Sequence, residues 1–209
     1  AAVGTAISLG IGAAVTALSI VVGGLVGLVA GYYGGWADRV ISGVIDITWG
    51  FPVILVAVVL AGVLERGLTI VILSVALINW AGFARIVRGE TLTLRERDFV
   101  RAARALGVPG PRILVRHFVP NMLAPTLVMG SYYIAITIIA EAGLSFIGVG
   151  VQPPTPSLGV MISEGRDYWD HSVWVVGVPG VVLAVLVVGL NALGDGLRDI
   201  LDPRLRERA

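Results

Sequence analysis

The sequence predicts an all-α fold, a polytopic bundle of membrane-spanning helices. Of its 209 residues, 56% are hydrophobic, and the mean hydropathy is +0.92. Only 14% of the residues are charged, whereas soluble domains carry about 25%. The apolar residues form runs long enough to cross a bilayer, which takes about 20 residues. Cysteine is absent, which excludes disulfides and thiolate metal sites.

Five apolar runs predict five spanning helices in one transmembrane domain that covers residues 1–209. The first run carries no charge and is rich in glycine, which permits close helix packing. The chain opens inside this run, so we expect it to be a fragment that lacks its native N-terminus. The spans are expected at about residues 5–30, 40–64, 68–87, 120–140 and 173–193.

A long segment, residues 141–172, separates the last two predicted spans. Its first part is apolar but interrupted repeatedly by glycine and proline, and its end is polar. Irregular backbone at membrane depth must be covered by protein or line a water-filled cavity. We therefore expect an extracytoplasmic cap that contains short helices.

The arginines predict the orientation. Thirteen of the fifteen fall in loops that five alternating spans place on one side, whereas Arg66 and Arg166 fall on the other. Cytoplasmic loops of membrane proteins carry the excess of basic residues. The loop at 95–120 and the tail at 197–209 are therefore expected in the cytoplasm.

The loop at 95–120 is the longest polar stretch of the chain, and its pattern predicts two short helices. Asp98 is expected to cap the first helix, because a carboxylate accepts bonds from free amides at a helix start. Phe99, Ala102, Ala103 and Leu106 follow at helical spacing and are expected to form one apolar face. Gly107 is expected to end the helix in a left-handed conformation. Its six arginines are Arg95, Arg97, Arg101, Arg104, Arg112 and Arg116.

The second short helix is expected to start at Pro111, which suits a first helical turn. Arg112 and Arg116 then share a face four residues apart, and Pro120 is expected to begin the next span. The arginines could pair with carboxylates of a partner or with anionic lipid. A plain basic loop that only fixes the topology is the alternative, and the residues alone leave this choice open.

The same loop resembles the coupling loop of binding-protein-dependent ABC importer permeases. The family pattern is Glu-Ala-Ala, three residues, Gly, nine residues, and Ile-x-Leu-Pro. Ala102 and Ala103 match its alanines, Gly107 its glycine and Pro120 its last proline. Arg101 stands where the family often has glutamate. The resemblance implies that Asp98, Arg101, Ala102, Ala103, Arg104, Gly107, Arg112 and Arg116 contact an ATPase.

Further stretches resemble the C-type permease subunit of the dipeptide, oligopeptide and nickel branch. They are G-Y-Y-G-G-W-A-D-R, A-R-I-V-R-G-E, A-E-A-G-L-S-F-I-G-V-G-V-Q-P-P-T-P-S-L-G and N-A-L-G-D-G-L-R-D-I-L-D-P-R-L. This resemblance implies six spans in the full subunit, located in a bacterial inner membrane. It also implies a peptide or nickel substrate.

The resemblance also implies the partners. They are a second, related permease subunit, two cytoplasmic ATPases that use ATP, and an extracytoplasmic substrate-binding protein. No nucleic acid is expected as a partner. This chain itself is expected to bind no cofactor or metal and to catalyse no reaction. It has neither the G-x-x-x-x-G-K-[ST] phosphate loop nor any lysine to build one.

Two acidic residues lie in or beside the apolar spans. A charged side chain is energetically unfavourable in a membrane, so Asp46 and Glu141 are candidate residues of the substrate pathway. Asp46 could instead make a structural contact with an arginine. For Glu141 we favour structural hydrogen bonds to the glycine-rich segment that follows it.

Two other functions remain open from the residues alone. A protease would use Ser145 and His117, but the predicted topology puts these on opposite sides, beyond hydrogen-bond reach. A proton-coupled secondary transporter would need ionisable groups that converge near the membrane midplane. Asp46 alone offers little support for that mechanism.

Overall fold

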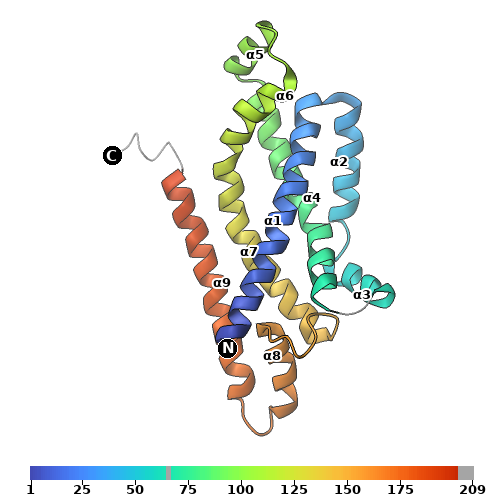
Figure 1. The fold of residues 1–209 in the computed structure, drawn as a ribbon, viewed down its shortest axis with the longest axis vertical. Helices are drawn as coiled ribbons and strands as arrows, with labels where there is room; N and C mark the ends of the chain where they lie inside the picture. Colours follow the sequence, from blue (N-terminus) through green and yellow to red (C-terminus); the bar gives the residue numbers. More distant parts are fainter. Residues whose placement is uncertain (65–66, 202–209) are drawn as a thin grey trace.

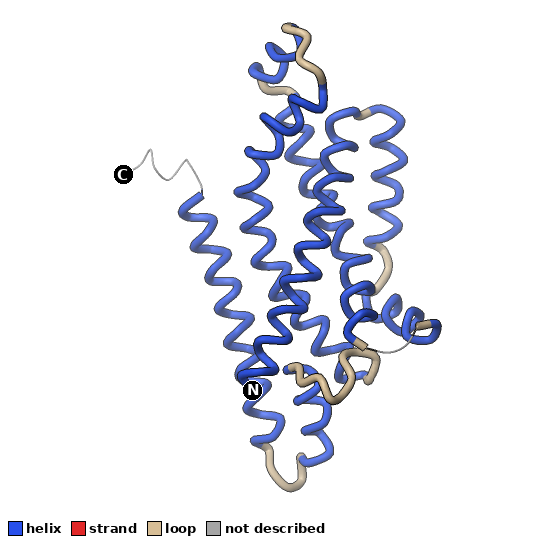
Figure 2. Tube along the Cα trace, in the orientation of Figure 1, coloured by secondary structure: helices blue, strands red, loops and turns tan. Residues whose placement is uncertain are grey.

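The computed structural model describes residues 1–64 and 67–201, and all regular structure within these ranges is helical (Figure 2). Four helices, one of them continuous from residue 110 to 147, are long and apolar enough to cross a membrane. The helices are α1 (Ala2–Tyr33), α2 (Gly35–Trp49), α3 (Val53–Val63), α4 (Leu68–Arg95), α5 (Asp98–Ala105), α6 (Gly110–Ile113), α7 (Val119–Ile147), α8 (Leu158–Gly165) and α9 (Trp174–Leu201).

The long helices stand side by side as a bundle (Figure 1). Helix α1 packs along α4, and α7 contacts both α1 and α9. Helices α5 and α6 lie at one end of the bundle, and α8 lies at the other. We refer to these as the α5 end and the α8 end.

The second predicted span, residues 40–64, is present as a bent pair of helices that together are apolar and long enough for one span, and not as one continuous helix. Helices α2 and α3 meet at an angle of 83°. Pro52, directly before α3, has an extended backbone with ψ of 128°. Proline has no N–H to donate, and it disfavours helix in the residue before it. These effects end α2 at Trp49 and turn the chain.

The second helix of the polar loop begins where Pro111 predicts, with α6 at Gly110, but the expected start of a new span at Pro120 is wrong. Instead, α6 and α7 are joined by a π-helical turn, Leu114–Phe118, into one helix of 38 residues. In this turn the Val119 N–H donates to the carbonyl of Leu114. The wider turn carries the helix through Pro120, where an α-helical N–H would be missing.

Glycines bring α1 and α4 into backbone contact. A Cβ atom at Gly23 would lie 2.3 Å from the carbonyl oxygen of Trp80, and one at Gly27 would lie 2.5 Å from that of Ala84. Gly31, one turn further on, would meet Thr91 in the same way. The absence of side chains at this spacing lets the two backbones approach, as in other membrane helix pairs.

Three apolar clusters of the described residues fill the bundle, and two of them lie towards its ends. The cluster towards the α8 end joins residues of α1, α3, α4, α7 and the segment before α8. The cluster at the α5 end consists of Val87, Val100, Ile113, Phe118 and Met122. Because Val100 belongs to α5, this second cluster fastens the short helix to the bundle.

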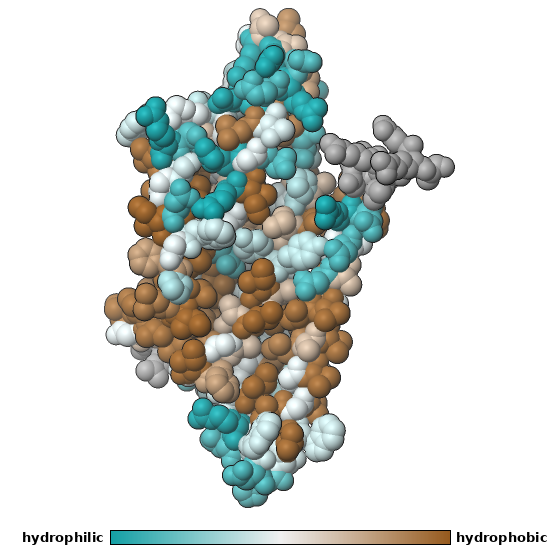
Figure 3. All heavy atoms as spheres, turned by 180° about the vertical axis from the view of Figure 1, so that it is seen from behind, coloured by the Kyte–Doolittle hydropathy of each residue, from teal (hydrophilic) through white to brown (hydrophobic). Residues whose placement is uncertain are grey.

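The surface carries an apolar band between two polar ends (Figure 3). Helix α9 contributes large exposed apolar side chains, among them Val181, Val185 and Val188. This distribution matches a bundle that lies in lipid and against other membrane-spanning chains.

Replacing Gly27 with valine is expected to lower the free energy of unfolding by about 1–3 kcal/mol, because the new side chain overlaps the α4 backbone. Gly24 provides the control, since nothing lies within 4 Å of a Cβ placed there. The measurement is thermal unfolding of the two purified variants in the same detergent. Equal melting temperatures would contradict the close α1–α4 packing.

Candidate functional site

Helix α5 ends in a Schellman motif. The Gly107 N–H donates to the carbonyl of Arg104 at 3.0 Å, and the Val108 N–H donates to that of Ala103 at 3.1 Å. Gly107 has a φ of +74°, the left-handed conformation that the sequence predicts. A glycine adopts this conformation without steric cost, so the helix stops here with its last carbonyls satisfied.

The start of α5 differs from the prediction. Arg97 occupies the capping position, with an extended backbone, and Asp98 is the first helical residue. The side chain of Asp98 makes no capping hydrogen bond. Its negative charge in the first turn still interacts favourably with the positive end of the helix dipole.

The buried face of α5 also differs from the predicted one. Val100 is fully buried and Ala103 and Val108 pack beside it, whereas Phe99 is 43% exposed and Leu106 is 83% exposed. The apolar spacing of this helix is compatible with either face. The cluster at the α5 end selects the side that carries Val100. We call the exposed residues Phe99, Ala102 and Leu106 the α5 outer face.

Two arginines of α5 have partners within the chain. Arg101 donates to Glu96 at 2.9 Å, and this bond holds the pKa of the Glu96 carboxyl below its usual value. The guanidinium of Arg104 lies over the ring of Tyr32, 4.8 Å from its centre. Arg112 and Arg116 are exposed on the helix that follows. The predicted arginine surface is thus partly occupied by contacts with its own chain.

The loops that the arginine count grouped together lie at one end of the molecule. The α1–α2 turn, α5 and the end of α9 are all towards the α5 end (Figure 1). The segment 148–173 lies at the α8 end, whereas residues 141–147, which were expected in the cap, are helical and belong to α7. Arg66 lies outside the described residues, as do residues 202–209 of the predicted tail.

A second site surrounds Glu141 near the α8 end of α7. Its side chain is fully buried and accepts three hydrogen bonds. Ser145 and Ser157 donate to Oε1 at 2.8 and 2.7 Å, and Ser8 donates to Oε2 at 3.1 Å. We call these four residues the Glu141 hub.

Each serine of the hub also accepts a backbone amide. Ser145 accepts from the Val151 N–H, Ser8 from Leu158 and Ser157 from Val160. The hub therefore provides acceptors for the amide of Val151 in the irregular segment and for two amides in the first turn of α8, and it ties this region to α1 and α7. The structural hydrogen bonds that we favoured for Glu141 are present.

Sequence reasoning did not find Ser8 or Ser157. The available signal was a serine on the glycine-containing side of an otherwise apolar helix, together with a serine directly before a helix. Neither pattern is specific, because small polar residues are common in spanning helices.

Asp46 forms an ion pair. Arg85 donates to its carboxylate at 2.5 Å and also stacks over the ring of Trp49, 4.1 Å from its centre. One turn further along α4, Arg88 binds both oxygens of Asp38, which lies in α2. The structure thus shows the contact with an arginine that we considered for Asp46, and these pairs join α2 to α4.

The structure does not bring together the two residues that a protease would need. Ser145 and His117 lie on the same continuous helix, 28 positions apart in sequence. At 1.5 Å per residue this separates them by about 42 Å. Residues 1–64 and 67–201 contain no group of three or more side chains able to hold a metal ion.

Comparison with known proteins identifies the family. Residues 23–207 match the model for the binding-protein-dependent transport system inner membrane component. The chain belongs to this family. It is 38% identical over 203 residues to a dipeptide transport system permease protein of Alkalihalophilus pseudofirmus. That match covers 97% of this chain and 67% of the relative.

Other relatives agree. A glutathione transport system permease protein of Pectobacterium atrosepticum is 39% identical over 97% of this chain and 67% of its own length. Among solved structures, the methionine ABC transporter MetNI in an inward-facing conformation superimposes with a TM-score of 0.69. That match covers 95% of this chain and 96% of the other, at 21% identity, and it shows a shared fold.

Membership of this family makes the chain a permease component of an ABC importer in a membrane. It gives no support to the proton-coupled alternative, and permease components are not themselves catalytic. The resemblance drawn from the coupling-loop residues is confirmed.

Replacing Glu141 with glutamine is expected to lower the free energy of unfolding of the permease by about 1–3 kcal/mol, since the amide nitrogen cannot accept a serine hydroxyl. Glu164→Gln is the control, because Glu164 is exposed on α8. Thermal unfolding and the rate of proteolysis between residues 149 and 157 report the effect. The hub would lose its proposed structural role if both variants behaved alike.

Proposed function

We propose that this chain is the permease subunit of an ATP-driven importer of short peptides, and that α5 couples it to a cytoplasmic ATPase. The relatives that share most of its length carry the names of dipeptide and glutathione permeases. ATP binds to the ATPases, and this chain itself carries no nucleotide. The α5 end faces the cytoplasm.

The observation that carries the proposal is the α5 outer face. Helix α5 projects beyond the ends of the long helices (Figure 1), and its anchoring residue Val100 is fully buried. Phe99, Ala102 and Leu106 remain exposed although they are apolar. A partner that covers this face would bury apolar surface around a small central residue, which permits close approach.

Movement of α5 would be transmitted through the chain segments and packing contacts that connect it to the long helices. The Schellman motif and the cluster at the α5 end attach α5 to the helix that starts at Gly110. That helix continues to Ile147 and carries Glu141 near its far end. Displacement of α5 by an ATPase would therefore move the hub and the segment at the α8 end.

The remaining partners follow from the exposed surfaces. A second, related permease subunit would cover apolar side chains of α9, such as Val181, Val185 and Val188, that are exposed in the single chain. The polar segment after α8, with exposed Tyr168 and Trp169, faces outward and is available to a substrate-binding protein. The pathway for the peptide lies between the two permease subunits.

Cysteine at Ala102 is expected to form a crosslink to the ATPase in intact membranes, because this position is exposed at the centre of the α5 outer face. Tyr168→Cys is the control, since its side chain is exposed at the α8 end. Mass spectrometry identifies the captured protein. Absence of the ATPase from the Ala102→Cys product, or its capture by both variants, would count against the proposed docking.

Replacing Gly107 with valine is expected to reduce peptide uptake at least fivefold relative to ATP hydrolysis. A β-branched residue is strained at positive φ, by about 1–3 kcal/mol, and the strain would displace α5. Gly107→Asn is the matched control, because asparagine tolerates this conformation. Uptake and ATPase rates are measured with the reconstituted complex and its binding protein. Normal coupling in the valine variant would contradict the role assigned to α5.

A further inference from the structure

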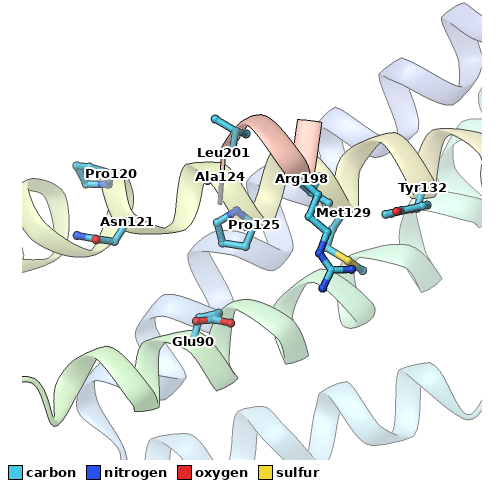
Figure 4. Close-up of a pocket in the computed structure, with 10 residues that line it drawn as sticks. Glu90, Pro120, Asn121, Ala124, Pro125, Met129, Tyr132, Arg198 and Leu201 are labelled. Carbon is cyan, nitrogen blue, oxygen red and sulfur yellow. The ribbon is translucent and has the colours of Figure 1, made fainter. Parts of the chain in front are cut away.

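A cavity of about 690 Å³ lies between α4, α7 and α9, towards the α5 end. Its volume falls within the range of about 300–1,000 Å³ that is common for small-molecule sites. Figure 4 shows the side chains around it. The lining residues are Glu90, Pro120, Asn121, Ala124, Pro125, Val128, Met129, Tyr132, Arg198 and Leu201.

The cavity carries one acidic and one basic side chain on separate helices. Glu90 extends from α4 and Arg198 from α9, and both are directed into the space between the helices (Figure 4). In the part of the chain that the structure describes, neither forms a salt bridge. Both side chains border the space that a ligand would occupy.

Hydrogen bonds fix the walls around these two charges. The Tyr132 hydroxyl donates to Asp195 Oδ1 at 2.5 Å and joins α7 to α9. The Asn121 side chain donates to the carbonyl of His117 at 2.6 Å, which leaves its amide oxygen free to accept. Met129 and Val128 add apolar surface between the polar groups.

We propose that this cavity binds the transported peptide at the inner end of its pathway, with Glu90 at the peptide ammonium and Arg198 at its carboxylate. The inference rests on the proposed function, because that function supplies a zwitterionic substrate. Residues with opposite charge on opposite walls match a short chain with a charge at each end. An arginine fork binds a carboxylate through two parallel hydrogen bonds.

Other ligand classes fit the lining less well. A lipid acyl chain would make use of neither charged side chain. A phosphate or another anion would approach Arg198 but would also meet the carboxylates of Glu90 and Asp195.

The test uses the complete complex with its ATPases and binding protein, reconstituted in proteoliposomes with a radiolabelled dipeptide that it transports. Glu90→Gln and Arg198→Gln are each expected to reduce the uptake rate about tenfold, through loss of one charge-assisted hydrogen bond. Asp199→Asn is the control, because Asp199 is exposed beside Arg198 but does not line the cavity. Arg198→Lys is expected to restore part of the rate.

A second measurement does not depend on altered charges. A photoreactive benzoylphenylalanine at Met129 is expected to capture the labelled dipeptide during ATP turnover. The same group at Leu123, which is on α7 but outside the cavity, is expected to capture none.

The outcomes separate the two proposals. Peptide uptake at the control rate by both glutamine variants, or absence of capture at Met129 while the complex transports the dipeptide, would overturn the cavity site and leave the proposed function standing. Failure of the unmodified complex to transport any short peptide would overturn both.

Discussion

The constraint on which this structure depends is that backbone N–H and C=O groups must find partners inside the protein wherever water is absent. Helices meet this demand along α1, α4, α7 and α9. Where the helix is interrupted, the chain supplies another solution. The π-helical turn before Pro120 keeps the backbone bonded through a proline, and the Glu141 hub supplies acceptors for amides of the segment before and within α8.

The hub shows how a buried carboxylate can serve a structural role. A buried carboxylate without donors would be strongly destabilising. Here it accepts from three hydroxyl groups, and each of these in turn accepts an amide, one from the irregular segment and two from the first turn of α8. Gly159 completes the arrangement, because a Cβ there would lie 2.6 Å from the Cα of Ala142. The buried charge of Glu141 is satisfied only because small residues, the serines and Gly159, let the backbone of α8 approach α7 closely.

The sequence was sufficient to predict the helical bundle, the long polar loop and the end of α5 at Gly107, because these follow from local chemistry. Hydropathy marks apolar runs, and a glycine followed by Val108-Pro109 stops a helix. The bend between α2 and α3 was missed although Pro52 was visible, since proline is tolerated in some spanning helices. Pro120 was expected to begin a new helix, but the helix continues through it.

The candidate site was predictable in position but not in detail. The family motif located α5, yet it did not indicate that Val100 would be the anchor and that Phe99 would face outward. That choice depends on Ile113 and Phe118, which come from a later part of the chain. The same limit applies to Ser8 and Glu141, which are 133 positions apart and meet only after the bundle forms.

The division of α5 into an anchored side and an exposed side has a consequence for how such permeases diversify. The residues that attach the helix belong to the interior, whereas Phe99, Ala102 and Leu106 are exposed. Under the proposed docking, substitutions among these three would change ATPase recognition without repacking the spans. A lineage would then be able to exchange its motor subunit and keep the channel architecture unchanged.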